Sequence, residues 1–153
     1  MRFGGQSVMR VLVFEPDPAL GWLIQRACGD QVQVMECRDF HSAREHLVTG
    51  RFDRLITNLR LRDYNGLHLV LLANAERCGI RAVVHTDRSD PYLAREARAI
   101  GAFFEASDRL PHALAAYLSP SLPESDRRNP DRSDRQRPCG VAAARPIAQC
   151  RSN

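Results

Sequence analysis

Five short apolar runs alternate along the chain with segments whose apolar residues recur at helical spacing. Short runs of this length are typical of strands, and apolar residues three and four positions apart indicate helices. Alternation of the two predicts βαβ units and a parallel sheet covered by helices on both faces. The predicted strands are 11–14, 32–34, 55–58, 82–86 and 103–104, and the predicted helices are 18–28, 43–47, 67–75, 91–100 and 111–118.

Helix boundaries are marked by two Asp-Pro pairs and by glycines. At Asp17-Pro18 and Asp90-Pro91, the Asp can accept the free backbone N–H groups of a first helical turn, and Pro fits the first helical position. Gly29, Gly50 and Gly101 follow three of the predicted helices and are expected to end them. The pattern therefore predicts a doubly wound α/β domain.

Polar residues follow several of the predicted strands. Glu15, Asn58 and Thr86 end or follow the first, third and fourth strands, and a polar segment follows Phe104. In open α/β sheets, ligands bind beyond the carboxyl ends of the strands. We therefore expect these residues, distant in sequence, to meet in one crevice.

Composition places the chain among globular proteins with one ordinary domain. It has 153 residues, of which 44% are hydrophobic and 26% charged, and a formal net charge of +4. All 22 basic residues are arginine. No apolar run is long enough to span a bilayer, and the start has no signal-peptide pattern.

The five cysteines show neither a C-x-x-C pair nor a His at metal-ligand spacing, which favours a reducing cytoplasmic compartment. They are Cys28, Cys37, Cys78, Cys139 and Cys150.

The chain divides into three parts. Residues 1–8 are expected to be a disordered extension, with Met9 as an alternative start, and residues 9–118 form the domain. From residue 119 the sequence becomes rich in Pro, Ser and Arg, and we expect a disordered tail over 119–153. Seven arginines oppose four acidic residues there, and no aromatic residue lies among them. This favours a solvated tail over nucleic-acid binding, which remains a third functional alternative.

Four segments together resemble the receiver domain of bacterial two-component response regulators. They are "MRVLVFEPDPAL", "FDRLITNLRLRDYNGL", "AVVHTDRSDP" and "EARAIGAFFEAS", and the resemblance covers residues 9–118. It implies a flavodoxin-like (βα)5 sandwich with five parallel strands in the order 2-1-3-4-5. Receivers accept a phosphoryl group from a sensor histidine kinase on an Asp that ends the third strand. Two further acids hold Mg²⁺, and a hydroxyl and a Lys stabilise the phosphoryl oxygens.

The resemblance places Asn58 at the phosphoacceptor position, where an amide offers no nucleophilic oxyanion. Glu15 matches the first acid, but Pro16 stands at the second, and Asp17 is interpreted as a helix cap. Thr86 matches the hydroxyl. We therefore expect Asn58 to be a vacated phosphorylation position whose amide is hydrogen-bonded to its neighbours.

The Lys position falls on Ala106 or Asp108, and Arg109 is the nearest cation. With the acceptor, one acid and the Lys all replaced, the resemblance implies a pseudo-receiver that is not an enzyme. Mg²⁺ binding is expected to be weak or absent, because the charge of the ligands holds the ion.

The favoured hypothesis is signalling by a stand-alone receiver through phosphorylation-independent protein–protein contacts. The partner would be a sensor kinase, another regulator or an output protein, and a homodimer is possible. Receivers commonly dock through the fourth helix, fifth strand and fifth helix. In this chain that face would include Tyr92, Arg95, Arg98, Phe104, Arg109 and Tyr117.

A second hypothesis keeps weak phosphotransfer. It uses Asp17 as a displaced metal ligand and a nearby carboxylate, such as Asp53 or Asp63, as the acceptor. Two other residues stay open: His85 is expected to pack at the end of its strand, and Trp22 either packs normally or anchors a partner.

Overall fold

The computed structural model describes residues 7–61, 63–76, 79–88 and 90–125. Within them, five parallel strands form one sheet in the spatial order β2-β1-β3-β6-β7. This confirms the predicted fold and strand order, because β6 and β7 are the fourth and fifth strands of this sheet. The strands are β1 (Met9–Phe14), β2 (Val32–Cys37), β3 (Arg54–Asn58), β6 (Arg81–Thr86) and β7 (Phe103–Ala106).

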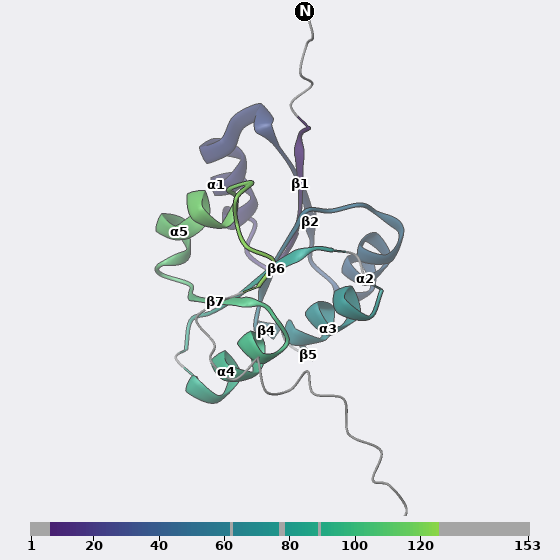
Figure 1. Ribbon diagram of the computed structural model, residues 1–153, viewed down its shortest axis with the longest axis vertical. Coiled ribbons are helices and arrows are strands. Elements are labelled where there is room, and N and C mark those ends of the chain that lie inside the picture. Colours follow the sequence, from purple (N-terminus) through teal and green to yellow (C-terminus); the bar gives the residue numbers. More distant parts are fainter. Residues whose placement is uncertain (1–6, 62, 77–78, 89, 126–153) are drawn as a thin grey trace, which may run out of the picture.

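Helices cover both faces of the sheet, and each face has its own core because successive side chains of a strand point to opposite faces. Val13, Ile56 and Val83 pack with the side chains of α1 and α5. Leu55 and Val84 pack on the opposite face with those of α2 and α3. The helices are α1 (Ala19–Cys28), α2 (Phe40–Thr49), α3 (Leu67–Ala75), α4 (Pro91–Ala99) and α5 (Leu110–Tyr117), and a short 3-10 helix, η1, spans Gly29–Gln31. Figure 1 shows α1 and α5 on one side of the strands and α2 and α3 on the other.

The predicted helix start at Asp90 is confirmed, and the one at Asp17 is shifted by one residue. Asp90 Oδ1 accepts from the backbone N of Tyr92 and of Leu93, both at 3.1 Å. Asp17 Oδ1 accepts from the backbone N of Ala19 at 2.9 Å, but α1 begins at Ala19, so Pro18 is its N-cap residue. Asp17 therefore still satisfies a free donor at the start of the helix.

A short hairpin that the sequence pattern did not predict lies between β3 and α3. Its strands are β4 (Arg60–Leu61) and β5 (Tyr64–Asn65), and they pair antiparallel. Gly66 then donates its N–H to the carbonyl of Leu59 at 3.0 Å. A Cβ at Gly66 would lie 2.2 Å from the carbonyl oxygen of Asn58. The hairpin can fold against the end of β3 only because residue 66 has no side chain.

The domain extends beyond the predicted boundary at 118. Leu122 is 8% exposed and packs in the core beneath α1 and α5, and its N–H is bonded to the carbonyl of Ser119. The Pro- and Ser-rich composition around it hid this anchor, so the prediction that residue 119 starts the tail was wrong. The predicted disorder over 1–6 and 126–153 lies outside the described residues. At the other end β1 begins at Met9, where the predicted domain starts and two residues before the predicted strand.

Candidate functional site: the crevice at the carboxyl edge of the sheet

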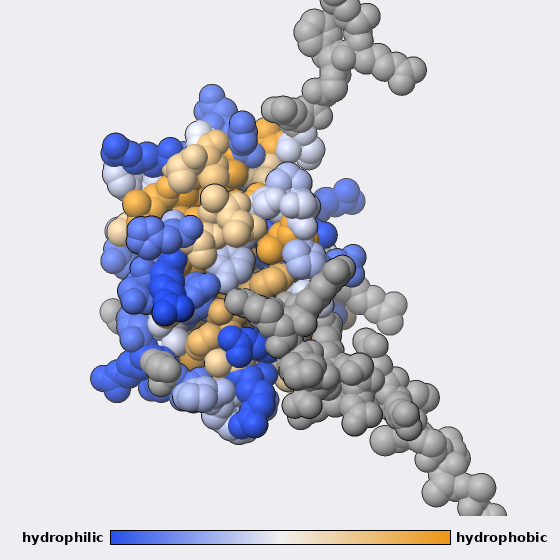
Figure 2. Space-filling model, turned by 60° about the vertical axis from the view of Figure 1, so that its left-hand side comes forward, coloured by the Kyte–Doolittle hydropathy of each residue, from blue (hydrophilic) through white to orange (hydrophobic). Residues whose placement is uncertain are grey.

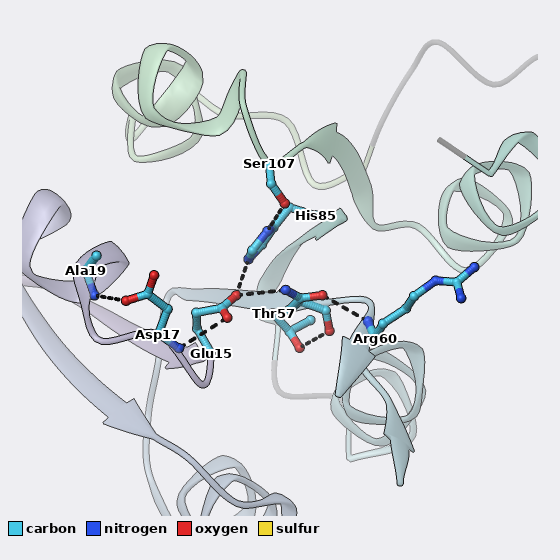
Figure 3. Close-up of polar contacts among 8 residues, drawn as sticks. Glu15, Asp17, Ala19, Thr57, Arg60, His85 and Ser107 are labelled. Carbon is cyan, nitrogen blue, oxygen red and sulfur yellow. Dashed lines mark hydrogen bonds and ion pairs between the residues drawn. The ribbon is translucent and has the colours of Figure 1, made fainter. Parts of the chain in front are cut away.

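Three neighbouring strands bring Glu15, Asn58 and His85 into one row. Phe14 of β1 pairs with Thr57 of β3, so the next residues, Glu15 and Asn58, are also opposite each other. Asn58 in turn pairs with His85 of β6. Each of the three lies two positions after a strand residue that packs against α1 and α5, namely Val13, Ile56 or Val83. Side chains two positions apart in a strand lie on the same face, so all three side chains lie on the face covered by α1 and α5. Figure 3 shows Glu15 and His85 pointing toward each other at the strand ends.

Both ends of the Asn58 amide are hydrogen-bonded. Nδ2 donates to Glu15 Oε2 at 3.1 Å, and Oδ1 accepts from the backbone N of Arg60 at 3.0 Å (Figure 3). The first bond comes from the crevice and the second from the start of the hairpin. Asn58 therefore links Glu15 to the hairpin, and its amide is bonded to its neighbours as expected.

His85 lies between an acid and a hydroxyl. It is 4% exposed, its Nδ1 is 2.9 Å from Ser107 Oγ, and its Nε2 is 3.0 Å from Glu15 Oε2 (Figure 3). The second contact has the length of an ion pair, but its direction is not that of a hydrogen bond. It is therefore electrostatic, and it is an ion pair only when the ring is protonated. His85 packs at the strand end as predicted, but its position in the crevice was missed.

The predicted hydroxyl position points away from this row. Thr86 is 3% exposed and follows His85, so its side chain lies on the opposite face of the sheet. Its Oγ1 accepts from the backbone N of Arg88 at 3.4 Å. Ser107 supplies the hydroxyl that reaches His85 instead.

Around the predicted Lys position, Ala106 pairs with Thr86 at the end of β7. Asp108 and Arg109 beyond it are exposed to solvent. Of this segment, Ser107 is the residue that lines the crevice.

The crevice is a cavity of about 240 Å³ with several carboxylates on its wall. Glu15, Asp17 and Asp87 line it together with Asn58 and His85. Asp87 was not among the predicted site residues, although it directly follows β6. The site therefore brings acids together, as expected, but from a partly different set of positions.

Neither proposed alternative acceptor lies in the crevice. Asp53 accepts from the backbone N of Arg10 at 2.7 Å, at the amino ends of β1 and β3. Asp63 lines a separate pocket beside the hairpin. Neither carboxylate therefore lines the crevice that contains Asn58.

The crevice does not fit Mg²⁺. This ion needs several oxygen ligands in near-ideal octahedral geometry. Glu15 Oε2 is already in contact with Asn58 Nδ2 and His85 Nε2, and Pro16 offers no side-chain ligand. Among the residues that the structure describes, no group of three His, Cys, Asp or Glu side chains could hold a metal ion. No metal-dependent step is supported by this arrangement.

The predicted docking face is partly exposed. Tyr92 is 61% exposed, and the Arg95 guanidinium lies 5.9 Å from the centre of its ring. Arg98 lies 6.0 Å from the ring of Phe104, and both are half-buried. On the side brought forward in Figure 2, hydrophobic side chains alternate with strongly hydrophilic ones.

Tyr117 does not belong to that exposed face. It is 6% exposed, its ring packs edge-on against Phe103 at 5.7 Å, and its hydroxyl donates to Glu105 Oε2 at 2.8 Å. The helical turn places it toward the sheet instead of solvent, so its inclusion was wrong. Trp22, in contrast, is 57% exposed on α1, with the Arg26 guanidinium 5.0 Å from its ring.

The chain matches no known protein family by sequence profile and no curated protein by sequence. Solved structures, however, match its fold. A CheY-like response regulator receiver domain protein from Methanospirillum hungatei JF-1 is 18% identical with a TM-score of 0.64, over 72% of this chain and 90% of that one. The chemotaxis response regulator CheY4 of Vibrio cholerae is 18% identical with a TM-score of 0.62, over 73% and 97%.

A third similar structure is a response regulator from Burkholderia pseudomallei, which contains a phosphorylated aspartic acid, a calcium ion and citrate. It is 19% identical with a TM-score of 0.63, and the match covers 74% of this chain and 68% of that one. These likenesses establish that the domain of this chain has the CheY-like receiver fold. Within the described part of the chain, no helix has the length and apolarity needed to cross a membrane.

Proposed function

We propose that this protein is a degenerate receiver that acts in two-component or phosphorelay-type signalling through protein–protein contacts that need no phosphorylation. It would be a cytoplasmic binding protein and not an enzyme. The receiver fold supports the signalling context, and Asn58 supports the loss of phosphoryl chemistry. An amide lacks the nucleophilic oxygen that attacks phosphorus, and this amide is already bonded at both ends.

The contacts of Glu15 support the same proposal. In a receiver this acid would help to hold the metal ion, but here its Oε2 atom faces an amide and an imidazole. These groups fix the crevice from within. A fixed crevice suits recognition of one constant conformation by a partner, such as a sensor kinase, another regulator, an output protein or a second copy.

The surface of α4 and β7 is the proposed contact face. Tyr92 and Arg95 are exposed there, and aromatic and Arg side chains are enriched among residues that dominate binding energy at interfaces. The same predicted face includes Arg98, whose guanidinium lies over the ring of Phe104. It also includes Arg109, which is exposed. Arg95→Glu should weaken partner binding at least tenfold, whereas Arg44→Glu, an exposed residue of α2 outside this contact face, should not.

The first experiment is an amide NMR spectrum of the full chain with and without Mg²⁺ and beryllofluoride, a mimic of an aspartyl phosphate. The proposal expects no change at Glu15, Asn58 or Thr86. Saturable shifts at these residues would show a working metal and phosphoryl pocket, and the proposal would be abandoned.

A second candidate is residual phosphoacceptor activity on a displaced carboxylate. The observation in its favour is that Asp17 and Asp87 line the crevice beside Glu15. A carboxylate oxygen would attack the phosphorus of a small phosphodonor and release its leaving group. This candidate expects labile phosphate on the protein after exposure to the phosphodonor, and this phosphate should disappear in Asp87→Asn or Asp17→Asn. Nucleic-acid binding by the tail concerns residues outside those described.

A further inference from the structure

A second cavity opens at the carboxyl edge of the sheet and shares no lining residue with the crevice. It has a volume of about 460 Å³ and lies between the loops that follow β1 and β2 and the β4–β5 hairpin. Pockets of roughly 300–1,000 Å³ are the usual size for specific ligands. We call it the aromatic pocket. Its lining includes Phe14, Arg38, Asp39, Phe40, Asp63 and Tyr64.

Three aromatic rings form its wall. Phe40 and Tyr64 stack with their centres 4.5 Å apart and their planes at 9°, and Phe14 lies 6.4 Å from Phe40. Phe14 is 2% exposed and forms the base, whereas Tyr64 is 49% exposed. A ring stacked on one side and open on the other can accept another flat group. Aromatic grooves of this kind bind proline rings and arginine guanidinium groups.

The rim of the pocket has charges of both signs. Asp39 accepts from Ser42 through the backbone N at 2.8 Å and through Oγ at 2.7 Å, and these bonds keep the pKa of its carboxyl low. The carboxylates of Asp39 and Asp63 can pair with guanidinium groups, and the guanidinium of Arg38 can pair with a carboxylate. The preferred occupant is a peptide that alternates Arg with Asp and contains Pro.

The chain itself contains such a peptide. We propose that the aromatic pocket binds residues 126–138, "DRRNPDRSDRQRP", of the same molecule. This segment has five Arg against three Asp, and two Pro. The Arg residues stack on aromatic rings and pair with carboxylates in a planar geometry, which a Lys ammonium cannot do. Its Pro residues fit an aromatic wall without leaving an unpaired N–H group.

The segment is long enough to reach the pocket. It begins directly after residue 125, the last that the structure describes. The preceding residues follow α5 to the amino edge of the sheet, where Arg54 at the start of β3 is bonded to the carbonyls of Tyr117 and Ser119. Thirteen extended residues span up to about 45 Å. A six-residue strand is only about 20 Å long, so the segment can run past the sheet to its carboxyl edge.

The covalent connection makes a weak contact sufficient. A short flexible linker gives an effective concentration in the millimolar range, so an interaction with a millimolar dissociation constant is already well populated. The inference does not depend on the proposed function.

The test compares amide NMR spectra of the full chain with and without four Arg→Gln substitutions at Arg127, Arg128, Arg132 and Arg135. Docking predicts shifts at residues 38–40, 61, 63 and 64. A matched control, Arg145→Gln with Arg151→Gln, should leave these amides unchanged. In a Tyr64→Ala background, the four substitutions should no longer shift residues 38–40. High salt should reproduce their effect.

Unchanged pocket amides in the fourfold variant would overturn the proposal. So would an equal effect of the control substitutions, because the contact would then be unspecific. Shifts that grow with protein concentration would also overturn it, because the segment would then come from a second copy. Retained dispersion of the remaining amides shows that each variant is folded.

Discussion

Arg54 ties the central strand β3 to the end of α5, and its loss should be the most costly single change outside the apolar core. The residue is 2% exposed. Its Nε donates to the carbonyl of Tyr117 at 2.9 Å and its Nη2 to that of Ser119 at 2.6 Å. Nη1 donates to the carbonyl of Asp53 at 3.0 Å. One buried guanidinium therefore satisfies carbonyls that a helix end leaves free.

Arg54→Met keeps much of the length and apolar stem of the side chain but removes the donors. Each buried carbonyl left without a partner costs about 1–3 kcal/mol. Two effects reduce this loss. Burial and the nearby charge of Arg81 lower the pKa of Arg54, so the charged guanidinium is itself unfavourable in the folded state, and its removal recovers part of the lost stability. The net loss in free energy of unfolding should be about 2–4 kcal/mol, a large part of the 5–15 kcal/mol typical of a domain.

Urea unfolding of the full chain, followed by far-UV circular dichroism, measures this difference directly. Arg51→Met is the matched control, because Arg51 is exposed and lies just before β3. Its effect should stay within about 0.5 kcal/mol. If Arg54→Met also stays within that range, the guanidinium does not hold the end of α5, and the reasoning from its three hydrogen bonds is wrong.

Three further changes test other parts of the structure by the same unfolding assay. Asn58→Asp replaces the donor to Glu15 with a second carboxylate, so the free energy of unfolding should fall by about 1–2 kcal/mol, and beryllofluoride should not raise it. The control Asn65→Asp keeps the oxygen that accepts from the backbone N of Leu67 and should leave the free energy of unfolding nearly unchanged. A beryllofluoride response in Asn58→Asp would contradict the account of the crevice. Gly66→Ala should cost about 2 kcal/mol or more, because its Cβ would meet the carbonyl of Asn58; a neutral result would show that the hairpin shifts freely. A chain that ends at residue 118 should have a free energy of unfolding about 2–4 kcal/mol lower than one that ends at 125, because it lacks the buried Leu122 side chain and the Ser119 carbonyl that accepts from Arg54. Equal stabilities would place the domain boundary at residue 118, where the composition changes.

The sheet could be predicted because its evidence is periodic and local. Each strand of the sheet has an apolar run, and helix starts such as Asp90-Pro91 have their own chemistry. The β4–β5 hairpin could not be predicted, because strands of two residues are too short to show any alternation. Leu122 was missed for a related reason: one apolar residue among Pro and Ser gives no periodic signal.

The crevice was predictable only in part. The likeness to receivers pointed to Glu15 and Asn58, which lie in contact. The link from His85 to Ser107 depends on the register of β3, β6 and β7, which sequence spacing does not give. A signal was nevertheless present, since His85 lies two residues after Val83 and must share its face of the sheet.

The side chain of Glu15 has partners on both neighbouring strands. A carboxylate at the edge of a buried sheet needs partners, and in a metal site the cation supplies them. In this crevice the amide of Asn58 and the imidazole of His85 supply them instead. Because Asn58 Nδ2 donates to Glu15 Oε2, an added cation would have to compete with that donor for the same oxygen. An acid at residue 58 would therefore add repulsion with Glu15 before it added metal affinity. This is the physical reason why the proposed function depends on the surface of the domain and not on the crevice.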